Sequence, residues 1–366
     1  MNSSVLHAPP APPTPPSSAR PAPTPRRCRL SGPGRPPTAP RAVVTVPVAA
    51  PAAGPSAATR TTTPPAAATV TPRPRALADL LALIRPGQWV KNFAVIPLAL
   101  LDTRYWSVSG LGRIAWAVGV FTLASAIVYV VNDLSDRERD RLHPVKRHRP
   151  LASGRISTVQ ALTLVGVLGA LLIAACATRP VTVWWPAGLY LAVNYAYSRG
   201  LKHVPLLDAF IVAFGFVLRF VEGCLVLSQP VPQWLAICVF SVCLLLSLGK
   251  RRHELLSAGS SHRPALSGYT LEFVDHLIVM VTGLTAVSYM LFIGDNPAFA
   301  GSAHLPALLS TFCALFGLAR YLQVLYVMKG GASPVKTLFQ DPVSRANSAL
   351  WAVLLGAALL LQRYVA

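Results

Sequence analysis

The amino-acid sequence predicts an all-α fold, a polytopic membrane bundle of about nine transmembrane helices. Of its 366 residues, 53% are hydrophobic and only 13% are charged, whereas soluble domains carry about 25% charged residues. Apolar runs long enough to cross a bilayer recur along the chain and are separated by polar loops. The number of basic residues also alternates between successive loops, which is typical of multi-pass membrane proteins.

The segment 1–75 differs in composition from the rest of the chain. It holds 20 of the 34 prolines and nine arginines, and it contains no Asp or Glu. Such a composition offers too little apolar surface to form a core, so we expect residues 1–75 to be a disordered Pro/Ala/Arg-rich extension whose deletion leaves activity intact. We expect residues 76–366 to form the membrane domain.

The membrane domain is expected to begin with an amphipathic helix over 76–84, which Pro86 and Gly87 should end. Apolar segments of spanning length follow it, and each is expected to form one transmembrane helix. These segments are 88–103, 112–131, 157–177, 181–198, 205–227, 231–249, 272–293, 303–327 and 346–364.

Basic residues set the expected orientation in the membrane. The loops after the second, fourth, sixth and eighth segments carry 7, 2, 4 and 3 Lys or Arg, whereas the other loops contribute only Arg104, Arg113 and Arg179. By the positive-inside rule, the N-terminus and the basic loops should face the cytoplasm and the C-terminus should be external. We therefore expect a multi-pass protein of the cell (inner or plasma) membrane.

The net charge of +20 does not indicate a nucleic-acid partner. Nine arginines lie in the segment 1–75, most other basic residues flank apolar runs, and the sequence holds no RNA- or DNA-binding motif. The six cysteines lack the spacing of metal ligands, and five of them lie in apolar runs, so we interpret those as small buried hydrophobic residues.

The stretch 132–150, NDLSDRERDRLHPVKRHRP, carries the candidate chemistry. Asp133, Asp136 and Asp140 are spaced i, i+3 and i+7, so they share one face if the helix continues through them. Clustered carboxylates at a membrane edge repel one another unless a cation neutralises them, and oxygen ligands favour a hard ion such as Mg²⁺. Removing one carboxylate should then leave thermal stability unchanged or raise it.

A basic group follows the acidic one and contains Lys146, Arg147 and Arg149, which suit phosphate oxygens. The two groups together predict a diphosphate substrate that binds with its metal ion. The competing interpretation is a solvated loop of mixed charge that merely follows the positive-inside rule.

Polar residues inside later apolar segments also require an explanation. Arg219 and Glu222 lie three residues apart in the segment 205–227, and we interpret them as a mutual ion pair facing the bundle interior. Whether that pair is structural or touches substrate is left open.

Four motifs resemble the UbiA superfamily of intramembrane prenyltransferases, and in particular its polyprenyl-phosphate phosphoribosyltransferases. They are QWVKN (88–92), NDLSDRERDRLHPVKRHRPLASG (132–154), YSRGLKHVPLLD (197–208) and GKRRHEL (249–255). The resemblance covers 77–366. It implies a UbiA-like helical bundle with a cytoplasm-facing cavity that opens laterally to lipid. It also implies transfer of phosphoribose from 5-phosphoribosyl diphosphate (PRPP) to a polyprenyl phosphate, with release of diphosphate.

The resemblance also implies a set of site residues. Asp133, Asp136 and Asp140 would be catalytic residues that hold Mg²⁺, and Asp208 would be a fourth catalytic carboxylate. The residues implied to bind substrate are Gln88, Lys91, Asn92, Asn132, Lys146, Arg147, Arg149, Tyr197 and Lys202.

Two alternatives remain at the level of sequence. One is a prenyltransferase that moves an isoprenoid from prenyl diphosphate to an aromatic or other small acceptor. Lys202 and the single carboxylate Asp208 in the loop 197–208 favour the PRPP reaction over it, because an added ammonium suits a donor with an extra phosphate. The other is a non-enzymatic membrane protein or transporter, which inverted repeats or broken midplane helices would favour.

Overall fold

The computed structural model describes residues 76–96, 106–258, 268–328 and 340–365. All of them belong to one compact unit, Thr69–Ala366. The expected disordered extension, 1–75, lies outside the described residues.

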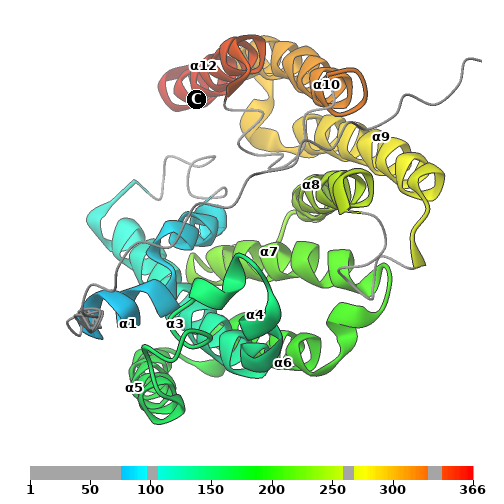
Figure 1. The fold of residues 1–366 in the computed structure, drawn as a ribbon. Helices are drawn as coiled ribbons and strands as arrows, with labels where there is room; N and C mark the ends of the chain where they lie inside the picture. Colours follow the sequence, from blue (N-terminus) through cyan, green and yellow to red (C-terminus); the bar gives the residue numbers. More distant parts are fainter. Residues whose placement is uncertain (1–75, 97–105, 259–267, 329–339, 366) are drawn as a thin grey trace, which may run out of the picture. The chain divides into compact units, whose positions relative to one another are not determined.

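The described ranges contain α-helices and short 3-10 helices and no β-strand, so the all-α prediction is confirmed (Figure 1). Helix α1, Ala76–Ile84, ends before Pro86, as the sequence predicts. A 3-10 helix, η1, Pro86–Val95, follows it. The residue between them, Arg85, has a φ of 50°, in the left-handed region, so the chain changes direction sharply at this point.

The long helices match the predicted apolar segments from the second to the ninth. They are α3 Val108–Ser135, α5 Thr158–Ala177, α6 Val181–Arg199, α7 Leu207–Val226, α8 Gln233–Ala258, α9 Leu271–Asp295, α10 His304–Tyr326 and α12 Pro342–Val365.

Among the described residues, seven helices are long and apolar enough to cross a membrane. Helix α6 is not one of them, although it has 19 residues. The predicted first span, 88–103, is not confirmed. Its residues up to Val95 belong to the 3-10 helix η1, and 97–103 lie outside the described residues. The predicted total of nine spans is therefore not established.

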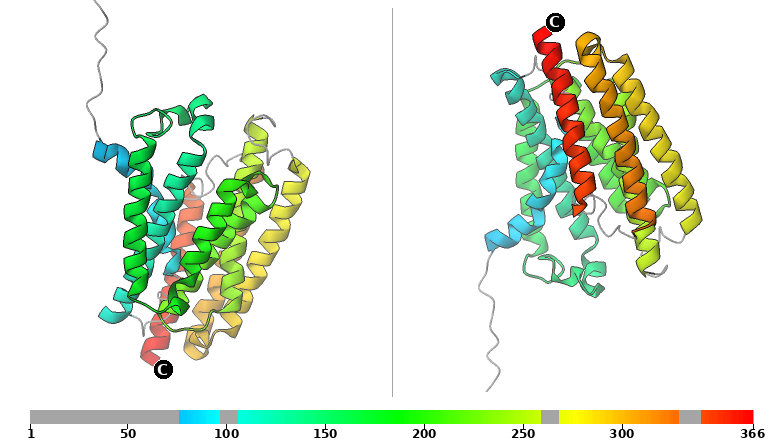
Figure 2. Two further views of the ribbon diagram at one scale, coloured as in Figure 1. Left: turned by 90° about the horizontal axis from the view of Figure 1, so that it is seen from below. Right: turned by 90° about the horizontal axis from the view of Figure 1, so that it is seen from above.

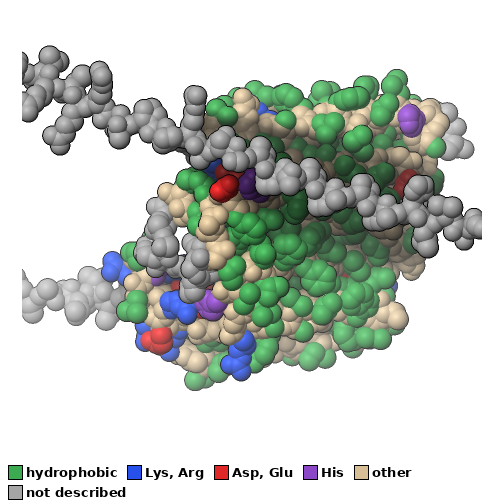
Figure 3. Space-filling model, turned by 90° about the vertical axis from the view of Figure 1, so that its right-hand side faces the viewer, with side chains coloured by type: hydrophobic (Ala, Val, Ile, Leu, Met, Phe, Trp, Pro, Cys, Tyr) green, Lys and Arg blue, Asp and Glu red, His purple; other side chains and the backbone are tan. Residues whose placement is uncertain are grey.

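Helix α7 connects two groups of helices within this unit. It packs against α3 and α6 on one side and against α8 on the other, and α8 continues into α9, α10 and α12 through successive contacts (Figures 1 and 2). Phe121 and Tyr190 are buried in the first group, and Phe220 and Phe292 in the second. Many large apolar side chains remain exposed, and Figure 3 shows them covering much of one face. Lipid is the solvent that such a surface requires.

The two ends of the first group of helices differ. At one end, the last turns of α3 and α6 meet, where Ser198 Oγ lies 3.4 Å from Asn132 Oδ1. At the other end, the Trp116 indole donates to the carbonyl of Ala175 at 3.2 Å, next to the α5–α6 turn. We call the first the aspartate end, because the motif 132–140 lies there.

The expected pair between Arg219 and Glu222 does not form. Arg219 donates to Asn92 Oδ1 at 3.0 Å, to the Gly215 carbonyl at 2.7 Å and to Tyr190 Oη at 3.1 Å. Glu222 is fully buried, and neither of its carboxylate oxygens has a hydrogen-bond partner in the part of the chain that the structure describes. The sequence interpretation was wrong because Arg219 turns towards Asn92, far away in sequence. A buried carboxyl without a partner lowers stability.

We expect Glu222→Met to raise the thermal unfolding temperature of the purified protein in detergent. The change removes an unsatisfied buried group and keeps a similar volume, so the gain in free energy of unfolding should be about 1–3 kcal/mol. The control Arg219→Met should lower the unfolding temperature, because Asn92 and Tyr190 lose their partner. A lower unfolding temperature for Glu222→Met would mean that Glu222 has a stabilising partner in the folded protein.

The last helix is fixed at its N-terminus by Asp341. One oxygen of Asp341 accepts from the Ser344 backbone at 2.8 Å and from the Ser344 hydroxyl at 2.7 Å. Arg320 of α10 contacts the same carboxylate through two nitrogens, at 3.0 and 2.7 Å. The bond from Arg320, and after it those from Ser344, hold the pKa of Asp341 well below its usual range.

We expect Asp341→Asn to lower the unfolding temperature at neutral pH. Because the folded pKa is lowered, the carboxylate stabilises the fold fully above the unfolded pKa of about 4. That contribution is lost as pH falls through the folded value. From about one pH unit above the unfolded pKa, the carboxylate is ionised in the unfolded state as well as in the folded state. The difference in unfolding temperature between wild type and Asp341→Asn should therefore be constant from pH 8 to 5 and should shrink below pH 5. A difference that grows on acidification would contradict this assignment.

Candidate active site at the aspartate end

The aspartate motif spans a break between two helices. Helix α3 ends at Ser135, and a short helix, α4, Arg137–Leu142, begins directly after Asp136. The condition under which the three carboxylates would share one helix face, a helix that continues through them, is therefore not met. The turn spacing is nevertheless retained, because the Asp136 amide donates to the Asn132 carbonyl at 3.0 Å and the Asp140 amide to the Asp136 carbonyl at 2.8 Å.

Arg149 bridges two of the three carboxylates. Its Nη1 lies 3.0 Å from Asp133 Oδ1 and 2.7 Å from Asp140 Oδ2. Arg85 Nη2 approaches the same Asp133 oxygen at 2.5 Å. Asp133 and Asp140 are each only 3% exposed. The cations nearest to this acidic pair in the structure are thus two arginines of the chain itself.

Asp136 has a different partner. Lys202 Nζ lies 2.6 Å from Asp136 Oδ1, and Lys202 is buried on η4, Leu201–His203, directly after α6. The structure therefore brings the predicted residues of the motifs 132–154 and 197–208 into direct contact. Lys202 thus contacts the aspartate motif itself.

Asp208 belongs to a second network, on α7. It is fully buried, its Oδ2 lies 2.8 Å from Arg251 Nε, and the Tyr269 hydroxyl donates to its Oδ1 at 2.7 Å. Tyr269 also accepts from the Leu206 amide at 2.7 Å. Burial, and then the bond to Asp208, raise the pKa of Tyr269, so the hydroxyl keeps the proton that it donates.

A glycine lets the Tyr269 segment approach Asp208. A Cβ on Gly268 would lie 2.3 Å from Pro205 Cγ, in the loop between α6 and α7. Only glycine permits this close approach. Sequence reasoning missed Tyr269, because nothing in the local pattern links it to a carboxylate 61 positions away.

The residues of QWVKN lie in different environments. The Asn92 amide is buried; it donates to Thr122 Oγ1 at 3.1 Å and Ser125 Oγ at 3.2 Å and accepts from Arg219. Lys91 is exposed and lies within electrostatic range of Arg85, Arg219 and Lys250. Gln88 is half-buried. Asn92 therefore joins η1 to the bundle, and Lys91 contributes to a positive field.

The remaining predicted residues lie around the aspartates. Lys146 Nζ is 4.0 Å from Asp140 Oδ1, and Arg147 is exposed beside it. Tyr197 is half-buried on α6, one residue before Ser198. Arg85, which sequence reasoning treated only as the residue before a helix-breaking proline, is a further member of the group. Its position three residues before Gln88 of QWVKN was the available signal.

The carboxylates do not converge on one point as metal ligands would. Within the described ranges, no group of three His, Cys, Asp or Glu side chains is arranged to hold a metal ion. Two oxygens, from Asp133 and Asp140, do converge on the single Nη1 atom of Arg149. The carboxylates can exchange these cationic side chains for a metal ion. Anionic phosphates would attract the cations, and the carboxylate oxygens would then be available to a divalent ion.

We expect Asp133→Ala to lower stability, in contrast to the unchanged or higher stability predicted from carboxylate repulsion. The mutation leaves Arg85 and Arg149 without a buried partner, which should cost about 1–3 kcal/mol after allowing for their partial exposure. Thermal unfolding in detergent without substrate measures this effect. The control is Glu138→Ala, because Glu138 pairs with Arg141 at the surface and its side chain is 75% exposed. That control should change stability by less than about 1 kcal/mol. Equal stability of Asp133→Ala and wild type would contradict the pairing.

Comparison with known proteins identifies similar sequences over most of the chain. The model of the UbiA prenyltransferase family matches residues 94–330. A decaprenyl-phosphate phosphoribosyltransferase of Mycobacterium tuberculosis (strain H37Rv) is 30% identical over 291 residues, which cover 77% of this chain and 94% of the relative. Its counterpart in Mycolicibacterium smegmatis is 33% identical over 237 residues, covering 61% and 73%.

Solved structures show the same arrangement of helices. A UbiA homolog from Archaeoglobus fulgidus, solved with GPP and Mg²⁺ bound, superposes with a TM-score of 0.56. The two sequences are 18% identical, and the match covers 78% of this chain and 99% of the homolog. At this identity the likeness concerns the fold, and it agrees with the helical bundle described above.

Proposed function

This chain belongs to the UbiA prenyltransferase family, and from that membership we propose that it transfers a 5-phosphoribosyl group from PRPP to a polyprenyl phosphate. The reaction releases diphosphate and leaves phosphoribose on a decaprenyl-type lipid, which serves the synthesis of lipid-linked pentose donors and cell-envelope polysaccharide. The observation that carries the proposal is the alignment with a decaprenyl-phosphate phosphoribosyltransferase over 94% of that relative's length. In this proposal the enzyme is a Mg²⁺-dependent pentosyltransferase.

The carboxylates of the aspartate end supply a donor set that fits Mg²⁺. Asp133, Asp136 and Asp140 would hold the ion, and all three offer the oxygen ligands that it prefers. Asp133 and Asp140 already direct two oxygens to one position, the one taken by Arg149 Nη1. When bound, Mg²⁺ would neutralise the charge that develops on the leaving diphosphate.

The basic side chains would bind phosphate oxygens. Arg85, Arg149 and Lys202 are held at the aspartates by ion pairs, so each is oriented before substrate arrives. Charge-assisted bonds from guanidinium and ammonium groups suit a diphosphate. Fixed charges of this kind stabilise the leaving group without reorganisation as the C1–O bond breaks.

The acceptor requires little activation. A polyprenyl phosphate is already ionised at neutral pH, so no strong general base is needed, and positioning should supply much of the rate. Asp208 would orient the ribose hydroxyls or a second Mg²⁺. Tyr269 and Arg251 would keep its carboxylate in place through the contacts described above.

The proposed site faces the cytoplasm of a cell membrane. The aspartate end carries the basic loops 132–156 and 199–204, and the positive-inside rule puts such loops on the cytoplasmic side. This orientation suits a soluble, cytoplasmic donor such as PRPP and an acceptor dissolved in the membrane.

The deciding experiment compares two substrate pairs. Purified protein with Mg²⁺ is incubated with labelled PRPP and decaprenyl phosphate, and separately with a prenyl diphosphate and an aromatic acid. Lipid-linked phosphoribose should form only in the first mixture. A prenylated acid in the second mixture, with no product in the first, would replace the proposal with the prenyltransferase alternative.

We expect Lys202→Ala to reduce kcat/KM for PRPP by roughly thirty- to a hundredfold, because a charged contact to substrate is lost. Lys202→Arg should restore only part of kcat/KM for PRPP, since a planar guanidinium group does not replace a compact ammonium group.

The matched control for Lys202 is Arg199→Ala, because Arg199 lies three residues earlier and is exposed over the Tyr195 ring. Its kcat/KM should stay within about twofold of wild type. If Lys202→Ala also stays in that range while its expression falls, Lys202 is a structural anchor only and its role in binding PRPP is excluded.

A further inference from the structure

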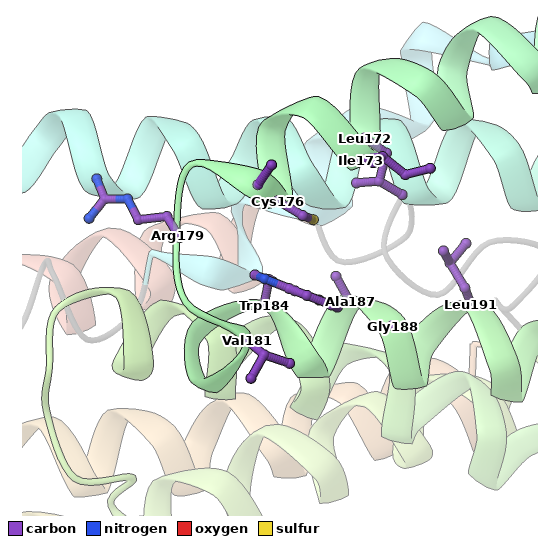
Figure 4. A pocket seen from close by; sticks show the side chains of 10 residues that line it. Leu172, Ile173, Cys176, Arg179, Val181, Trp184, Ala187, Gly188 and Leu191 are labelled. Atoms are coloured by element: carbon purple, nitrogen blue, oxygen red, sulfur yellow. The ribbon is translucent and has the colours of Figure 1, made fainter.

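An apolar groove lies between α5 and α6. These helices are consecutive in the chain, but α5 packs on α3 whereas α6 packs on α3 and α7, so they make few contacts with each other. The space between them has a volume of about 440 Å³. Figure 4 shows Leu172, Ile173 and Cys176 of α5 facing Trp184, Ala187 and Leu191 of α6 across the gap.

The groove is separate from the candidate active site. It lies beside the turn that joins α5 to α6 (Figure 4), and that turn is at the end of the helices opposite to the aspartates. Its last residue on α6, Leu191, precedes Ser198 at the aspartate end by seven positions, which is roughly 10 Å of helix. A ligand of the groove therefore need not touch the aspartate motif.

The lining of the groove suits hydrocarbon. Its side chains are apolar apart from Arg179 and the Trp184 indole nitrogen, and the volume falls in the range of about 300–1,000 Å³ that is usual for ligand sites. Ile173, on its rim, is 71% exposed, as expected for a side chain that faces lipid. In a bilayer the available occupant of such a space is a lipid chain.

Arg179 gives the groove a charged end. Its guanidinium lies 5.6 Å from the centre of the Trp116 ring, and it forms no ion pair with any of the residues that the structure describes. No Asp or Glu occurs between Asp140 and Asp208 in the sequence.

Tryptophans mark the headgroup level of membranes, and Trp116 and Trp184 lie at this end of the groove. An unpaired guanidinium at that level complements a lipid phosphate.

We propose that the groove binds one acyl chain of an anionic phospholipid, with the headgroup phosphate on Arg179. The lipid belongs to the leaflet opposite to the aspartate end. It fills the gap between α5 and α6 and thereby holds α5 to the bundle. This site is independent of the transferase reaction, because its residues lie outside the proposed catalytic group.

The test is native mass spectrometry of the full-length protein in detergent, titrated with phosphatidylglycerol or with phosphatidylcholine of the same chains. Wild type should bind one phosphatidylglycerol about fivefold more tightly than phosphatidylcholine, the preference that one basic residue provides. Arg179→Gln should abolish this preference, and Arg179→Lys should keep it. Gly188→Leu, which fills the groove, should weaken binding of both lipids.

The controls use the same substitutions outside the groove. Arg113→Gln removes an arginine of α3, and Gly283→Leu changes a lipid-facing glycine of α9 that has open space around it. Both should bind phosphatidylglycerol as wild type does. Unfolding temperatures, measured with and without phosphatidylglycerol, should rise with lipid in wild type and in both controls, and not in Gly188→Leu.

Two results would overturn the proposal. One is binding of phosphatidylglycerol to Arg179→Gln and Gly188→Leu with wild-type affinity and preference. The other is displacement of the lipid by glycerol 3-phosphate, which has the phosphate and no acyl chains, because the apolar groove would then contribute nothing.

Discussion

Neutralisation of buried carboxylates is the constraint on which the aspartate end depends. Asp133 and Asp140 are almost inaccessible to solvent, and a buried carboxylate without a cation costs several kcal/mol. Arg149 satisfies both, Arg85 adds a second contact to Asp133, and Lys202 satisfies Asp136. These bonds draw together the residue before η1, the end of α3, the loop after α4 and the turn after α6. The same groups that fix the local fold are those that a diphosphate and its metal ion require.

The contrast between Arg219 and Glu222 shows how the bundle treats polar groups in its interior. Arg219 has three hydrogen bonds and lies over aromatic rings, so its charge joins η1, α6 and α7. Glu222, three residues later, is buried without hydrogen bonds of this kind among the described residues. Both residues are buried, and their different environments follow from the position of Asn92, whose amide reaches one and not the other.

The chemistry is concentrated at one end of the helices, and the opposite end is built for lipid. Carboxylates, guanidiniums and ammonium groups gather where α3 and α6 finish, whereas the turn between α5 and α6 offers tryptophan, apolar side chains and one arginine. This division would suit the proposed reaction, in which a charged donor comes from water and the acceptor from the bilayer. The membrane supplies the solvent for the exposed apolar surface in between.

The sequence by itself determined most of the long helices, and it predicted which segment carries the candidate site. Apolar runs gave the bounds of α5, α6 and α7 to within two residues, since the bilayer fixes the length of a spanning segment. The spacing of Asp133, Asp136 and Asp140 indicated the candidate site. Tertiary structure alone decided which cation meets which carboxylate: Arg85 reaches Asp133 across 48 positions and Lys202 reaches Asp136 across 66. Local sequence patterns predict where a helix lies and which residues share one of its faces. The pairing of distant side chains depends instead on how the helices pack, so the roles of Arg85 and Tyr269 could be identified only from the folded chain.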